Sequence, residues 1–171
     1  KGFVSSFIGY TEKSVRKDIA NMLNDIGVPC RVLEKLHPNE TGTVTPPTHD
    51  AHIEWTMMAH DASLSDAMQD ADTVIGMRSI ALLEAAMRGF RPASYQPGRI
   101  GPDQCTAVRL GLSESLSTPS ALKDWLKRAI SGQHVRDINP DVPPFATPDA
   151  TQNICDVIKS MCAETPKDEE C

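Results

Sequence analysis

What the sequence lacks excludes several protein classes. No apolar run approaches the roughly 20 residues of a membrane-spanning helix, and no secretory signal is visible. The 17 lysines and arginines are scattered without a basic run and the formal net charge is −6, so nucleic-acid binding is not expected. The five cysteines include no CxxC pair, which argues against a disulfide framework and predicts buried free thiols and a cytoplasmic location.

Metal-binding and dinucleotide-binding motifs are missing as well. His49, His52 and His60 have spacings that match neither HxxxH nor HExxH, so we predict no metal site. The GxGxxG fingerprint of dinucleotide-binding folds is also absent. The apolar fraction of 40% is enough for a real core, and a single domain is expected over residues 1–171, with residues 164–171 as a frayed tail.

The stretch 72–98 carries the strongest pattern in the chain and predicts one βαβ unit. The apolar run 73–75 is typical of a buried strand and ends at Gly76. Ser79 offers an N-cap hydroxyl to a helix that ends at Gly89, and an extended segment follows. Such a strand–turn–helix junction leaves unpaired backbone N–H groups at the positive end of the helix dipole, which favours a phosphate site.

The rest of the chain repeats the alternation of strands and helices. Strands are expected at residues 3–8, 30–36, 53–58, 73–75, 90–95 and 106–111. Helices are expected after Thr11, Ser63, Ser79, Thr118 and Thr147. Because parallel strands need helical crossovers, the fold class is α/β: a Rossmann-like three-layer sandwich with a parallel sheet of about six strands.

Candidate ligand-binding residues also lie near the ends of the first two predicted strands. Ser6 and Gly9 lie at the first strand–helix junction. His37 directly follows the second strand, where its imidazole would point into the crevice in which open parallel sheets bind ligands, and Pro38 keeps the backbone extended there. A surface loop histidine is the alternative interpretation. Glu84, in the second turn of its helix, either reaches a ligand's ribose hydroxyls or pairs with Arg88 at i+4.

Two segments resemble a known family. The pattern Gly-Met-x-Ser-x-x-Leu-Leu-Glu-Ala-Ala-x-x-Gly at 76–89, followed by a strand and Gln-Pro-Gly, resembles the donor-binding segment of GT-B glycosyltransferases and the related nucleotide-sugar 2-epimerases. Lys35-Leu36-His37-Pro38 resembles the Lys-x-His-Pro segment of GT-B enzymes that build bacterial capsules and other surface polymers, including sialyl- and Kdo-type transferases. In element order, nearly the whole chain resembles a GT-B C-terminal domain.

The resemblance implies a donor nucleotide-sugar, CMP- or UDP-linked, as ligand and no cofactor. His37 would contact the donor phosphate, the loop from Gly76 would line it, and Glu84 would hold the ribose. The expected nucleotide-sugar-binding residues are Ser6, Gly9, His37, Pro38, Gly76, Met77, Arg78, Ser79, Ile80 and Glu84. Arg78 has an alternative as a solvated surface arginine. The predicted function is donor binding within a glycosyltransferase of surface polysaccharide or glycolipid biosynthesis.

The same resemblance bears on partners and turnover. In GT-B enzymes the acceptor site, and usually the general base, belongs to an N-terminal domain, which we expect to be missing from this chain. We therefore expect a fragment that binds the donor but does not catalyse its transfer. Any peripheral association with a membrane is expected to occur through the full-length protein. Two alternatives stay open: a 2-epimerase-like domain, disfavoured because the Asp-Ser-Gly-Gly run is absent, and a non-catalytic α/β binding or regulatory module.

Overall fold

The computed structural model describes residues 9–36, 44–59 and 61–132, together with positions 149, 152, 155, 156 and 159. The chain divides into two compact units, residues 1–140 and 141–171. Several sequence predictions lie outside the described residues. These are the strand at 3–8 with Ser6, the pair His37 and Pro38, the tail 164–171, and most of the helix after Thr147.

Helix α1 (Glu12–Ile26) begins and ends where the sequence predicts. Thr11 and Ser14 form a capping box, in which the Thr11 hydroxyl accepts the Ser14 N–H at 3.1 Å and the Ser14 hydroxyl accepts the Thr11 N–H at 2.9 Å. Gly27 follows with φ of 69°, a left-handed conformation that glycine adopts without strain. Both ends of the helix are therefore fixed by local sequence.

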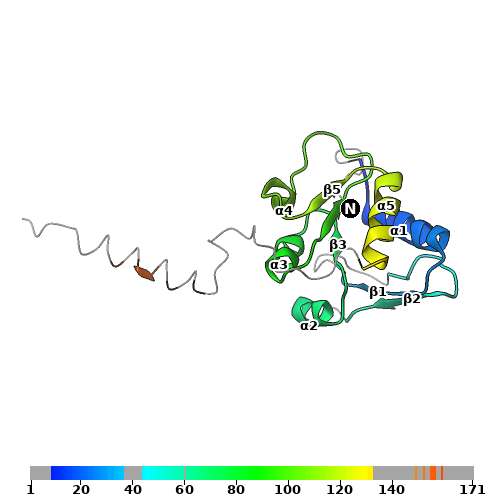
Figure 1. Ribbon diagram of the computed structural model, residues 1–171, viewed down its shortest axis with the longest axis horizontal. Coiled ribbons are helices and arrows are strands. Elements are labelled where there is room, and N and C mark those ends of the chain that lie inside the picture. Colours follow the sequence, from blue (N-terminus) through cyan, green and yellow to red (C-terminus); the bar gives the residue numbers. More distant parts are fainter. Residues whose placement is uncertain are drawn as a thin grey trace, which may run out of the picture. The chain divides into compact units, whose positions relative to one another are not determined.

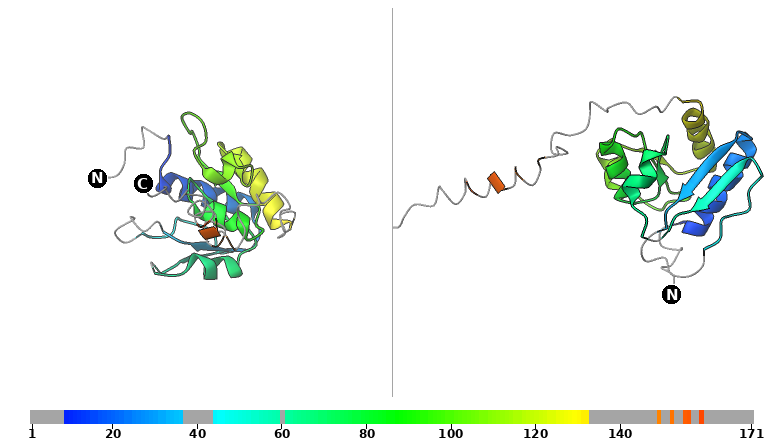
Figure 2. Two further views of the ribbon diagram at one scale, coloured as in Figure 1. Left: turned by 90° about the vertical axis from the view of Figure 1, so that its left-hand side faces the viewer. Right: turned by 90° about the horizontal axis from the view of Figure 1, so that it is seen from below.

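Strands β1 (Cys30–Glu34) and β2 (Ile53–Met57) pair in parallel, with Cys30 opposite Ile53 (Figure 2). A salt bridge from Arg16 of α1 to Glu34 ties this pair to the helix, and Glu34 also accepts the Trp55 indole N–H at 2.9 Å. These strands confirm two predicted elements, although β1 ends two residues earlier than expected.

Strands β3 (Ile75–Gly76), β4 (Ala93–Tyr95) and β5 (Glu114–Leu116) form a second parallel sheet in the order β3-β4-β5. The described residues thus contain parallel sheets of two and three strands, which confirms an α/β fold.

The strand predicted at 106–111 is wrong, because these residues begin with helix α4 (Thr106–Arg109). The run is short and apolar, a pattern that helices and strands share. The Asp103 carboxylate accepts the N–H of Cys105, the residue before the helix, at 2.8 Å, so a side chain outside the run holds the turn from which the helix begins.

Helices lie on both sides of the three-stranded sheet (Figure 1). Helix α1 packs with α5 (Pro119–Ile130) on one side, around the fully buried Trp125 and Tyr95. Helices α3 (Ala81–Met87) and α4 lie on the other side, where buried side chains of α3 pack in two small clusters. Helix α2 (Leu64–Gln69), capped by Ser63 as predicted, joins one of these clusters.

The cysteine expectation is only partly correct. Cys105 is buried, but Cys30 is half-buried and Cys155 is exposed, and all three are free thiols. Cys105 stands at the N-cap of α4, directly before the segment 106–111 that was predicted as a strand. Among the described helices, none combines the length and apolar character needed to cross a membrane.

Candidate functional site

The carboxyl ends of β3, β4 and β5 lie at one edge of their sheet, because all three strands are parallel. Two polar side chains are buried here: Ser94 on β4 is 0% exposed, and Gln96 immediately after β4 is 1% exposed. Buried polar groups are stable only when hydrogen-bonded. Their partners therefore define how the loops at this edge are held.

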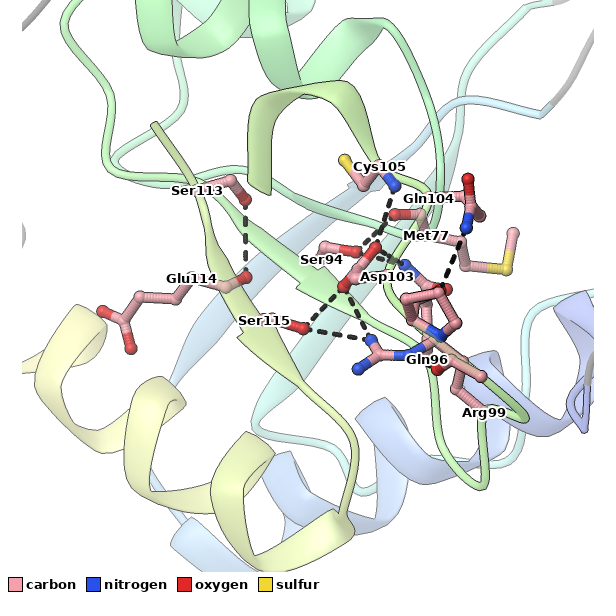
Figure 3. A network of polar contacts seen from close by, with 12 residues as sticks. Met77, Ser94, Gln96, Arg99, Asp103, Gln104, Cys105, Ser113, Glu114 and Ser115 are labelled. Atoms are coloured by element: carbon pink, nitrogen blue, oxygen red, sulfur yellow. Dashed lines mark hydrogen bonds and ion pairs between the residues drawn. The ribbon is translucent and has the colours of Figure 1, made fainter. Parts of the chain in front are cut away.

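Gln96 joins three segments of the chain. Its Nε2 group donates to the Ser94 hydroxyl and to the Asp103 carboxylate, both at 2.7 Å, while its Oε1 accepts the Tyr10 hydroxyl at 3.1 Å. Ser94 in turn donates to the Met77 carbonyl at 2.7 Å (Figure 3). One amide thus connects the turn before α1, the loop after β3 and the loop after β4.

Asp103 is the second centre of this edge. Its carboxylate accepts hydrogen bonds from the Arg99 guanidinium at 2.7 Å and from the Ser115 hydroxyl of β5 at 2.5 Å (Figure 3). Arg99 also donates to Ser115 at 3.0 Å. Burial alone would raise the pKa of Asp103, but the hydrogen bonds from Ser115, Cys105 and Gln96, together with the charge of Arg99, lower it below its usual value. We call Ser94, Gln96, Arg99, Asp103 and Ser115 the carboxyl-edge network.

A small open hollow lies beside this network. It is open to solvent, and its cavity volume is about 30 Å³. The lining residues are Tyr10, Arg78, Gln96, Arg99, Ile100, Pro102 and Gln104. This volume lies below the roughly 300–1,000 Å³ of pockets that enclose a whole small molecule. The hollow is therefore suited to one small group of a ligand rather than to a complete nucleotide.

Three of the lining side chains are two arginines, Arg78 and Arg99, and the phenol of Tyr10. Burial raises the pKa of Tyr10 even though Arg78 and Arg99 lower it, so the phenol is protonated at neutral pH. Arg78 is exposed, and within the described part of the chain it makes no hydrogen bond or ion pair. It is one of the predicted site residues, and the structure places it at the hollow.

Gly9, another predicted site residue, has a structural role. Its φ is 87°, and a Cβ at this position would lie 2.0 Å from the carbonyl oxygen of Gly98. Gly98 itself has a φ of 67°. The turn before α1 and the turn after β4 thus approach so closely that only glycine is accommodated at position 9.

The predicted residues around the start of α3 are held by local contacts. The Ser79 hydroxyl accepts the Ala81 N–H at 3.1 Å, but the N-cap of α3 is Ile80 and no side chain caps this helix, so the predicted N-cap position of Ser79 is wrong by one residue. Ile80 is 70% exposed, and Gly76 packs against the Leu82 side chain. Glu84 forms the i,i+4 salt bridge with Arg88, at 3.0 Å, on the exposed face of the helix. Among the predicted site residues that the structure describes, only Arg78 lines the hollow. The ligand roles of all the predicted site residues stay predictions.

Tyr10, Gln96, Arg99 and Asp103 were not among the predicted site residues. Gln96 was interpreted only as part of the Gln-Pro-Gly segment that ends a strand. Its position in the sequence could have indicated a site, because polar residues that directly follow buried strands gather at the carboxyl edge of a parallel sheet.

The histidines that the structure describes are engaged elsewhere. The His49 ring stacks on Trp55 with ring centroids 6.1 Å apart, and His52 lies 3.4 Å from the Leu23 carbonyl oxygen. No group of three or more His, Cys, Asp or Glu side chains suited to a metal ion occurs among the described residues. Comparisons of the chain with protein-family models, with curated proteins and with solved structures find no match.

Proposed function

We propose that this chain is the donor nucleotide-sugar-binding domain of a GT-B-type glycosyltransferase that acts in surface polysaccharide or glycolipid biosynthesis. The observation that carries the proposal is the position of Arg78. The Gly76–Ser79 segment, which carries the family-like motif, leaves β3 at the carboxyl edge of a parallel sheet, beside a hollow with two arginines. Open parallel sheets bind their ligands at this edge.

The finer fold within this proposal is a Rossmann-like three-layer sandwich with one parallel sheet of about six strands. Two features of the described residues support it. The strands of both described sheets are parallel, and helices lie on both sides of the three-stranded sheet.

The proposed chemistry is the stabilisation of a leaving group. As the glycosidic bond of the donor breaks, negative charge develops on the departing phosphate, and groups positioned to meet that charge lower the barrier. Backbone N–H groups of the Gly76–Ile80 turn, together with Arg78 and His37, would supply this stabilisation. Glu84 would bind the ribose, for which its carboxylate must share or release Arg88. The acceptor and a general base would come from an N-terminal domain of the same cytoplasmic protein.

Calorimetric titration of the purified chain with CMP, CDP, UDP, GDP and AMP tests this proposal. Selective binding of one pyrimidine nucleotide is expected, and Glu84→Ala and His37→Ala should each weaken it. Glu54→Ala is the matched control for Glu84, because Glu54 is an exposed glutamate on β2, in the other sheet. A chain that binds none of these nucleotides at millimolar concentration, or that Glu84→Ala and Glu54→Ala affect equally, contradicts the proposal.

A further inference from the structure

The two arginines of the hollow differ in how they are held. Arg99 has a side chain that is 20% exposed, and its Nη1 group is bound to Asp103 and Ser115. Its Nε group donates to the Gly101 carbonyl at 3.1 Å. Within the described residues, its Nη2 group has no hydrogen-bond partner. Arg99 is therefore a fixed cation with donor capacity left over, next to a hollow that its own side chain lines.

Arg78 faces the same hollow without such restraints. It is exposed, and in the described part of the chain it makes no ion pair. The acidic groups that act on Tyr10 are Asp103 and Glu12, and Asp103 is already paired with Arg99. Of the four charged groups that shift the pKa of Tyr10, Glu12 has the smallest effect. Among the described residues, the positive charge of Arg78 is thus the one at the hollow that has no acidic partner.

We propose that the hollow is an oxyanion subsite that takes one phosphate group of the ligand between the fixed Arg99 and the unrestrained Arg78. A planar guanidinium binds phosphate oxygens through paired N–H donors, and the size of the hollow limits the occupant to a small group. Helix α1 begins two residues after Tyr10, so the positive end of a 15-residue helix adds to the attraction.

This subsite deepens the proposed function and rests on it for the identity of the whole ligand. It differs from the turn at the start of α3, because Tyr10, Arg99 and Gln104 come from other loops. Asp103 is a positioning residue in this assignment: it holds Arg99 through the ion pair and does not line the hollow itself.

The test is calorimetric titration of the 171-residue chain with inorganic pyrophosphate, UDP, CMP and the phosphate-free nucleosides uridine and cytidine. Arg78→Gln is expected to weaken pyrophosphate and nucleotide binding by about tenfold or more, the usual effect of losing a charged hydrogen-bond donor. Nucleoside binding should not change. Arg31→Gln is the matched control, because Arg31 is an exposed arginine on β1 that does not line the hollow.

A second variant tests the geometry rather than the charge. Arg99→Lys keeps a cation beside Asp103 but loses the planar fork and its free Nη2 donor. We expect it to weaken pyrophosphate binding about tenfold, with folding verified by circular dichroism and thermal unfolding.

The outcomes separate this subsite from the proposed function. Selective nucleotide binding that is equal in the parent chain and in Arg78→Gln overturns the subsite and the phosphate contact of Arg78. It leaves donor binding itself standing, through His37, Glu84 and the Gly76–Ile80 turn. Pyrophosphate binding that depends on Arg78, without any preference for a nucleotide, supports the subsite and contradicts the donor-domain proposal. Failure of both pyrophosphate and nucleotides to bind overturns both.

Discussion

The start of α3 and the hollow beside β4 lie at the same edge of one sheet, but they are built differently. At the start of α3, Ser79 and Glu84 each contact a residue of their own turn or helix, and Glu84 is 42% exposed. At the hollow, Gln96 and Asp103 are bonded to segments far away in sequence, including Tyr10, 86 residues from Gln96.

This difference explains what a sequence motif can reveal. Contacts within a helix turn follow from spacing alone, so the Glu84–Arg88 pair could be foreseen from sequence and the start of α3 was predicted to within one residue of its Ile80 N-cap. Contacts across the carboxyl edge depend on which loops the sheet brings together. The region with the recognisable pattern is therefore the locally held one, and the region with the buried polar network was missed.

The largest expected effect is at the glycine contact that joins the loops of the hollow. Gly9→Ala would place a methyl group 2.0 Å from the Gly98 carbonyl oxygen and force alanine into a φ of 87°. The conformational cost and the overlap together should lower the free energy of unfolding by roughly 3 kcal/mol or more. Urea denaturation followed by circular dichroism measures this loss.

Gly101→Ala separates the two contributions. Gly101 also has a φ of 87°, but a Cβ there would meet no atom within 4 Å. It should therefore lose only the conformational part, about 1 kcal/mol. Equal losses for Gly9→Ala and Gly101→Ala would show that the close approach of the two turns does not contribute to stability.

A smaller effect is expected from Asp103→Asn, which tests whether the carboxyl-edge network acts through charge. The variant leaves the Arg99 guanidinium without its ion pair, and it should lower the free energy of unfolding by about 2 kcal/mol at pH 7. Ser115→Ala is a useful companion, because it removes one neutral hydrogen bond to the same carboxylate and should cost about 1 kcal/mol.

The pH dependence of this effect has a definite sign. The pKa of Asp103 in the folded chain lies below the usual value of 3.8 that it has in the unfolded chain. Its stabilising contribution is therefore complete above 3.8, and it is lost as the pH falls from there through the lower pKa of the folded chain. The difference in stability between the parent chain and Asp103→Asn should therefore shrink below about pH 4. A difference that stays constant from pH 7 to pH 3 would contradict the assigned role of the charge.

Much of the fold could be predicted for the same reason as the local contacts at α3. Thr11 and the Thr118-Pro119 pair begin their helices through caps that lie within the sequence of each helix. The segment 106–111 was predicted wrongly because a short apolar run does not distinguish a helix from a strand, and the turn before its helix is held by Asp103, whose carboxylate accepts the Cys105 N–H. Gln96 escaped notice because its partners Tyr10 and Asp103 come together only in the folded chain.

The smallest expected effect on stability is at Glu84. A variant of this residue distinguishes a surface ion pair with Arg88 from a carboxylate that binds ribose. Glu84→Gln removes an exposed i,i+4 pair with Arg88 and should change the free energy of unfolding by less than about 0.5 kcal/mol. If Glu84 binds ribose, the variant should instead weaken uridine or cytidine binding several-fold, because it loses the carboxylate that accepts hydrogen bonds from the ribose hydroxyls. Calorimetry on Glu84→Gln and Arg88→Gln separates these cases. Both variants break the salt bridge, but only Glu84→Gln removes the carboxylate, so equal nucleoside affinity in the two variants would make Glu84 a surface residue of α3.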